Sequence, residues 1–255
     1  MSELTAKELY IRQISIHGDI PADNYVAHIP VVQHLMRHTL ELHKPVTIFV
    51  GENGIGKSTL IEAIAVSMQF NAEGGTKSLS FATQAIHSSL HAYLRTAKGR
   101  KSEDGFFLRA ESFYNVATII DELDKEPSFG PPLIDSYGGK SLHAQSHGES
   151  FMALMENRFG GNGLYILDEP EAALSPMRLM RMMYIMHDLI QRESQFIIST
   201  HSPLLMMFPG ADVLQCTQDG IARVRYQDTE HYQITRMFMD NPDRMFHYLF
   251  TEDAQ

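Results

Sequence analysis

Cysteine is nearly absent from this sequence, since Cys216 is the only one among 255 residues. A single thiol excludes an intrachain disulfide and a cysteine cluster for zinc. The first residues show no charged segment followed by an apolar one, so no secretory signal is recognised. No apolar run approaches the length that crosses a bilayer. We therefore expect a cytoplasmic protein without direct membrane insertion.

Positive charge is also scarce, because 21 Lys and Arg face 31 Asp and Glu, which gives a formal net charge of −10. This balance argues against a surface that serves as a whole as a platform for nucleic acid or anionic membrane. The length suits one large domain or two lobes. One basic run is either a solvated loop around Gly99 or a local DNA contact; it consists of Arg95, Lys98, Arg100 and Lys101.

The most informative segment is residues 51–58, which read GENGIGKS and match the phosphate-binding P-loop pattern G-x-x-x-x-G-K-[ST] without deviation. Residues 46–50 before it predict a buried strand, and the helical spacing of apolar residues after it predicts a helix. In that setting backbone N–H groups and the helix dipole favour an anion. We expect a nucleotide site that contains Gly51, Asn53, Gly54, Ile55, Gly56, Lys57, Ser58 and Thr59.

Chemical roles can be given to side chains at three predicted strand ends. In the P-loop, Lys57 would reach the β- and γ-phosphates of ATP and Ser58 would ligate Mg²⁺. The apolar strand 164–167 ends in Asp168, which can hold the Mg²⁺ shell, and Glu169, which can polarise the attacking water. A third apolar strand, 196–199, leads to His201, which can hydrogen-bond the γ-phosphate.

Taken together, these residues resemble the ABC-type ATPase superfamily, and the order of the motifs matches. Residues 51–59 look like its Walker A motif, 164–169 like Walker B with the catalytic glutamate, 173–176 like the D-loop, and His201 like the switch histidine. The runs DEPE at 168–171 and STHS at 199–202 look closest to small soluble predicted ATPases. These are related to SMC-like and overcoming-lysogenization (OLD) type AAA heads.

The resemblance also implies a site shared between two subunits. Residues 145–149 read QSHGE where the family has its signature LSGGQ. Ser146 and Gly148 match, while Gln145, His147 and Glu149 depart. In the family this segment caps the ATP bound to a second subunit, which implies a homodimer. The Q-loop glutamine is missing, and Glu111 is the nearest candidate for its place and for a metal ligand.

The fold that follows is α/β, with a mainly parallel sheet flanked by helices and a helical subregion that carries the signature. We expect a single ABC-type ATPase domain over residues 1–255. Its nucleotide-binding lobe would span about 1–85 and 155–255, and its signature-bearing subregion about 86–154.

The expected function is ATP binding and hydrolysis by an ATPase that dimerises with ATP. Two alternatives stay open. One is the ATP-binding subunit of a membrane transporter, and the other is a slow nucleotide switch that recruits a nuclease or another protein effector. DNA is a further potential partner, through the basic run.

Other patterns predict local structure. Residues 31–42 suggest a short helix, Asp219-Gly220 a hairpin between 213–217 and 221–226, and Asn241-Pro242 the start of a last helix. The histidine pairs 34/38 and 87/91 fit a polar helix face better than a metal site. A helix over 176–192 carries methionines that we interpret as core filler: Met177, Met180, Met182, Met183 and Met186.

Overall fold

A six-stranded, mostly parallel sheet forms the centre of the protein. The computed structural model describes residues 3–77, 88–125 and 131–251. The strand order is β5-β6-β7-β3-β8-β9, and only the pair β8–β9 is antiparallel. This confirms the α/β class. The strands are β3 (Val46–Val50), β5 (Asp104–Arg109), β6 (Gly163–Asp168), β7 (Gln195–Ser199), β8 (Asp212–Thr217) and β9 (Gly220–Val224).

Both faces of this sheet are buried, which explains why its inner strands are rich in apolar residues. In β3, Phe49 belongs to one hydrophobic cluster, with α2, while Val46, Ile48 and Val50 belong to a second cluster on the opposite face. Helices α3 to α6 contribute to this second cluster. The α-helices are α1 (Pro30–Arg37), α2 (Lys57–Ser67), α3 (Phe113–Leu123), α4 (His147–Arg158), α5 (Pro176–Gln191), α6 (Pro203–Met206), α7 (Glu230–Asp240) and α8 (Pro242–Thr251).

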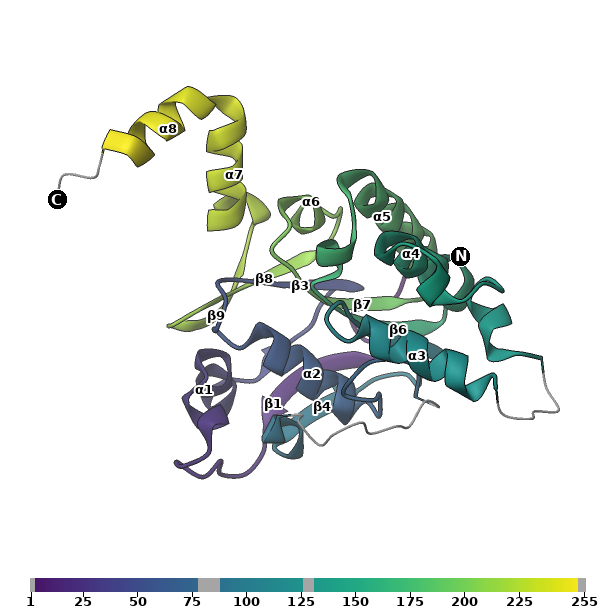
Figure 1. Cartoon of the computed structure of the whole chain (residues 1–255). Helices are drawn as coiled ribbons and strands as arrows, with labels where there is room; N and C mark the ends of the chain where they lie inside the picture. Colours follow the sequence, from purple (N-terminus) through teal and green to yellow (C-terminus); the bar gives the residue numbers. More distant parts are fainter. Residues whose placement is uncertain (1–2, 78–87, 126–130, 252–255) are drawn as a thin grey trace.

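A second, antiparallel sheet with the order β2-β1-β4 packs beside α2 (Figure 1). Its strands are β1 (Ile11–Ile16), β2 (Leu40–Glu41) and β4 (Leu94–Lys98). A side-chain amide joins it to the central sheet, because Gln195 accepts from the Ile11 N–H and donates to the Ile11 carbonyl, both at 2.9 Å. The Tyr10 hydroxyl adds a bond of 2.8 Å to the Glu193 carbonyl.

Two local predictions need correction. The helix expected over 31–42 ends at Arg37, and Leu40 then pairs with Ile14 in the small sheet. On α5, Met182 and Met186 are fully buried as expected, but Met177 and Met180 are 72% and 51% exposed and are not core filler. The hairpin around Asp219-Gly220 is confirmed, with Thr217 opposite Gly220.

The last two helices form an arm that stands away from the sheets (Figure 1). Neither α7 nor α8 buries a residue, although each has one apolar side. The helix start at Pro242 is confirmed, and the Asn241 side chain accepts from the Arg244 N–H at 3.0 Å. Apolar side chains that stay exposed on this arm are Ile234, Met237, Met239, Phe246, Leu249 and Phe250.

Candidate functional site

The predicted site residues meet at the carboxyl edge of the central sheet. Strand register sets Arg109 opposite Asp168, Asp168 opposite Ser199, and Ser199 opposite Phe49. Because these strands are parallel, the residues that follow each of them emerge at the same edge, where open α/β sheets bind ligands. The fold thus brings the P-loop, the Asp168-Glu169 pair and the segment containing His201 together.

The P-loop runs from β3 into α2 through glycines that no other residue could replace without strain. Gly51 has φ +146°, and a Cβ there would lie 2.2 Å from the Cys216 carbonyl oxygen. Gly56 has φ +100° and is the N-cap of α2, and a Cβ there would lie 2.1 Å from Ile29 Cγ2. The first backbone N–H groups of α2 have no partner within the helix, so they can bind an anion.

Residues of the loop divide into those that face solvent and those that anchor it. Asn53 and Gly54 are exposed, Thr59 is half-buried, and Ile55 is buried in the core cluster that includes α2. The Lys57 ammonium donates to the carbonyls of Gly51 at 2.6 Å and Glu52 at 2.8 Å, so it lies inside the loop.

Burial lowers the pKa of Lys57, while the negative charges of Glu169, Asp168 and Glu171 oppose that shift. A buried cation that bonds only to carbonyl oxygens is well suited to receive phosphate oxygens.

Asp168 and Ser58 form the oxygen-donor pair that the sequence predicts for Mg²⁺. The Ser58 hydroxyl donates to Asp168 Oδ1 at 3.1 Å, and the Ser199 hydroxyl donates to the same oxygen. Burial raises the pKa of Asp168, because a carboxylate loses solvation there, and the hydrogen bonds and Arg109 only partly offset this. A divalent cation would supply the missing compensation.

Arg109, at the end of β5, is a residue that the sequence analysis missed. Its guanidinium pairs with Glu62 of α2 at 2.8 Å and with Asp168 Oδ2 at 3.4 Å. Glu62 is buried and also accepts from the Ser88 N–H at 2.8 Å. A basic residue at the end of a predicted strand is the only signal in the sequence, and its partners are distant in the chain.

Glu169 has the left-handed backbone conformation, with φ +49° and ψ +51°. A non-glycine residue held there stores strain, and such residues cluster at functional sites. Its carboxylate Oε1 lies 3.5 Å from Nε2 of His201. The backbone N–H of His201 donates to Glu171 Oε1 at 2.6 Å. The carboxylates of Glu169 and Glu171 therefore both contact His201.

His231, in the first turn of α7, is a second residue that the sequence analysis missed. Its Nε2 lies 3.0 Å from Nδ1 of His201, and the ring centroids are 5.1 Å apart. The arm is therefore in direct contact with the site.

Two cavities adjoin these residues. One of about 180 Å³ is lined by Ser58, Asp168, Glu169, Arg109 and His147, and another of about 280 Å³ lies between the P-loop, β8 and His231. Among the described residues, no group of three or more His, Cys, Asp or Glu side chains is arranged to hold a metal ion. Ser58 and Asp168 nevertheless fit Mg²⁺, which needs only one or two protein oxygens beside phosphate and water.

The signature-like segment leads into α4, which starts at His147 with Ser146 as its N-cap residue. Ser146 is exposed, and its hydroxyl donates to Glu149 Oε2 at 2.6 Å. Gly148 is buried, and a Cβ there would lie 2.9 Å from the Ala173 carbonyl, so it permits close packing on the segment after Glu169. The His147 ring stacks on Phe113 of α3 and lines the smaller cavity.

The remaining candidates lie at the margin of this site or away from it. The Glu111 side chain is 84% exposed, 3.9 Å from Arg109, and adjoins the smaller cavity. In the basic run, Arg95 and Lys98 belong to β4 and Arg100 pairs with Glu193, so the run is not simply a loop. The rings of His34 and His38 are 4.9 Å apart, whereas His87 is outside the described residues.

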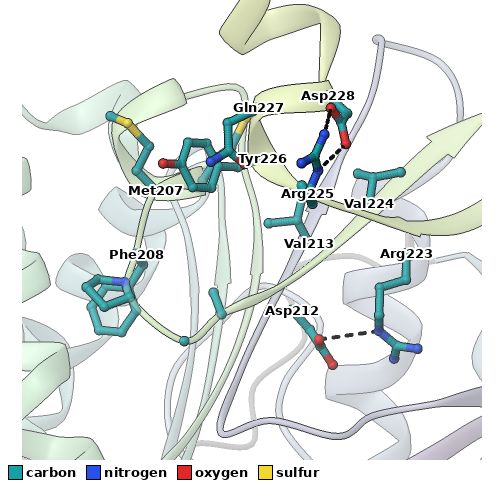
Figure 2. Close-up of a pocket in the computed structure, with 14 residues that line it drawn as sticks. Met207, Phe208, Asp212, Val213, Arg223, Val224, Arg225, Tyr226, Gln227 and Asp228 are labelled. Carbon is teal, nitrogen blue, oxygen red and sulfur yellow. Dashed lines mark hydrogen bonds and ion pairs between the residues drawn. The ribbon is translucent and has the colours of Figure 1, made fainter.

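A third cavity, of about 700 Å³, is larger than the two described above, and its lining is distant from the P-loop in sequence. It lies between the loop that precedes β8 and the segment that leads into α7. Figure 2 shows Asp212 paired with Arg223, at 3.3 Å, and Arg225 paired with Asp228. Each of these two acidic side chains thus has an arginine as its partner.

Two family models match parts of this chain. Residues 31–123 match a family model described as "AAA domain". Residues 141–207 match one described as "AAA domain, putative AbiEii toxin, Type IV TA system". No curated protein matches the chain. Within the described residues, no helix is both long enough and apolar enough to cross a membrane.

Solved structures share the fold at low sequence identity. CbiO1 from Clostridium perfringens, described as part of the ABC transporter complex CbiONQ, is 16% identical with a TM-score of 0.52, over 94% of this chain and 98% of that one. An ATP-binding cassette of an ABC transporter is 14% identical with a TM-score of 0.50, over 94% and 99%. A nucleotide-free cassette is 14% identical with a TM-score of 0.50, over 92% and 97%.

Proposed function

This chain is a P-loop protein with the fold of ABC/AAA-type ATPases, and we propose that it binds ATP with Mg²⁺ and hydrolyses it. The observation that carries the proposal is the convergence of Lys57, Ser58, Asp168 and Glu169 at one sheet edge, with Ser58 bonded to Asp168 at 3.1 Å. Phosphoryl transfer to water needs mostly positioning and charge stabilisation, and these groups supply both.

Each side chain has a distinct task in this proposal. The loop N–H groups and Lys57 bind the phosphates, and Ser58 with Asp168 hold Mg²⁺, which supplies charge neutralisation when bound. Glu169 accepts a proton from the attacking water, since its partly exposed carboxylate is held by a strained backbone. His201 provides a hydrogen-bond donor on the γ-phosphate side.

The decisive experiment measures nucleotide binding by calorimetry and phosphate release on the purified chain. In Lys57→Ala we expect tight ATP binding to be lost, because the cation that would meet the phosphates is removed. The thermal melting temperature of the variant, measured alongside, separates this from a misfolded loop, because Lys57 also bonds to Gly51 and Glu52. Unchanged ATP affinity in a folded variant would contradict the assignment.

We further propose that the protein works as an ATP-dependent homodimer, in which Ser146 of one copy faces the nucleotide on the other. Ser58, Asp168 and Glu169 line the smaller cavity, and a two-fold arrangement of two copies would complete two identical sites. The exposed position of Ser146 at the start of α4 supports this.

A slow nucleotide switch that recruits a protein effector is the second candidate. The exposed apolar side chains of the α7–α8 arm favour it, since such surfaces mark interaction sites. Steady-state turnover of the isolated chain separates the candidates: sustained hydrolysis without a partner favours the stand-alone ATPase, and a single slow turnover favours the switch. A transporter cassette is the less favoured function, because β5 ends at Arg109 and continues as Ala110-Glu111, without the glutamine of the Q-loop.

A further inference from the structure

The contact between His201 and His231 links the nucleotide site to the C-terminal arm. The two histidines are far apart in sequence, yet Nδ1 of His201 and Nε2 of His231 lie at hydrogen-bond distance, 3.0 Å. The other nitrogen of His201, Nε2, lies 3.5 Å from Glu169 Oε1 and has no hydrogen-bond partner of its own. One ring therefore touches α7 on one side and the proposed base on the other.

The place of His231 is fixed by the start of α7. Thr229, the N-cap residue of α7, is fully buried. Its hydroxyl donates to the Tyr226 carbonyl at 2.6 Å and lies 3.7 Å from the sulfur of Met206 in α6, the helix that follows His201. The first turn of α7 is thus anchored to the same segment that carries His201, while the rest of the arm is exposed.

Hydrogen-bond chemistry selects one arrangement of protons. A carboxylate only accepts, so the nitrogen of His201 that faces Glu169 is suited to carry the ring proton. In a neutral ring with its proton there, Nδ1 is an acceptor, and the bond to His231 forms when Nε2 of His231 carries its proton. Burial lowers the pKa of His231, and the positive charge of Lys57 acts in the same direction, against Glu230 and Glu52.

We propose that His231 is a positioning residue for His201: its Nε2–H donates to Nδ1 of His201 and holds that ring as the Nε2–H tautomer, with the remaining N–H directed at the Glu169 and γ-phosphate side. This inference rests on the proposed ATPase function for its catalytic consequence. The structural part of the inference is the tautomer of His201, which does not depend on bound nucleotide. If His201 contacted a γ-phosphate, its hydrogen bond to His231 would transmit that contact to the first turn of α7, so the position of the arm would respond to the nucleotide state.

Two substitutions separate the hydrogen bond from packing. His231→Phe keeps an aromatic ring in place but removes the donor, and His231→Gln keeps a side-chain N–H donor. Thr235→Ala, at an exposed position of the same helix, is the matched control. Nitrogen-15 NMR of the histidine rings in nucleotide-free protein reports the tautomer, and His201→Ala assigns the signals by their loss.

We expect His201 to be the Nε2–H tautomer in the wild type, in Thr235→Ala and in His231→Gln, and a mixture of tautomers in His231→Phe. In ATPase assays, kcat of His231→Phe should fall about fivefold to tenfold, the scale of one lost positioning hydrogen bond, while KM for ATP stays within about twofold. His231→Gln should restore most of kcat.

An unchanged His201 tautomer in His231→Phe, or wild-type kcat in that variant, would overturn the proposal. A wild-type protein without ATPase activity would instead defeat the proposed function, and the NMR result would still decide whether His231 sets the His201 tautomer.

Discussion

Among the proposed catalytic residues, Glu169 has the most strained backbone conformation. It follows the buried strand β6 directly, has a positive φ, and its side chain is 38% exposed, beside His201. Both Asp168 and Glu169 line the smaller cavity, but Asp168 is buried whereas the Glu169 side chain is partly exposed. One carboxylate is therefore available for the metal and the other for water.

Replacing Glu169 by Gln should separate binding from hydrolysis. The amide keeps the size of the side chain but does not accept a proton, so we expect ATP to bind normally while hydrolysis falls by roughly 10²–10⁴-fold. Quench-flow phosphate release and ATP titration measure the two effects. Turnover at the wild-type rate would mean that another group is the base.

Single residues differ in how far the sequence reveals them. Lys57, Ser58, Asp168 and Glu169 can be predicted because each belongs to a short motif at a strand end. Arg109 and His231 cannot, because their roles come from partners such as Glu62 and His201 that only the fold brings close. The structure places these residues, but the chemical roles given to them stay predictions, as do those of Glu111, Ser146 and Gly148.

At the scale of elements, the junction between the P-loop and α1 is tightly packed. A Cβ at Gly56 would lie 2.1 Å from Ile29 Cγ2 and 2.9 Å from Val31 Cγ2, whereas a Cβ at Gly54 would meet nothing within 4 Å. Both glycines have positive φ, so they share the backbone cost of a substitution but differ in crowding.

We expect Gly56→Ala to lower the free energy of unfolding more than Gly54→Ala. Each should lose about 1–2 kcal/mol from the left-handed backbone, and Gly56→Ala should lose a further amount of about 1–3 kcal/mol from overpacking. Urea denaturation of the two variants measures the difference. Equal losses would show that α1 moves aside at little cost.

The strands that are rich in apolar residues could be predicted well from the sequence. Strands β3, β6 and β7 are buried on both faces, so their composition alone identifies them. The small sheet could not be assembled from sequence, because β1 pairs with β4, a strand that carries Arg95 and Lys98 of the basic run and has no apolar pattern to identify it. The helix α7 had a readable signal, since Thr229 is followed by apolar residues at helical spacing, among them Ile234 and Met237.

At the scale of the whole molecule, dimerisation is the most consequential proposal. The Glu169→Gln protein should be mainly dimeric with ATP and Mg²⁺ and shift toward monomer without nucleotide, because trapped ATP would hold two copies together. Light scattering over a range of protein concentrations measures this. The same mass with and without ATP across that range would contradict a shared site.

Two variants at the start of α4 sharpen the test. In the Glu169→Gln background, Ser146→Arg should block closure by bulk while leaving monomer ATP binding intact. Glu149→Gln should favour the dimer, since the Glu149 carboxylate bonds to the Ser146 hydroxyl and adds negative charge where the partner's phosphate would approach. If Ser146→Arg dimerises fully with ATP, the two sites do not work in trans.

The position of β3 in the sheet has a consequence for biosynthesis. Its neighbours on both sides come late in the chain, because Val46 pairs with Phe196 and Thr47 with Asp212. A nascent chain therefore carries the P-loop out of the ribosome long before the strands that flank it are made. Contacts of such large sequence separation form slowly, and the apolar strand has no native partner in the interval. We therefore expect chaperones that shield exposed strands during synthesis to raise the yield of this protein.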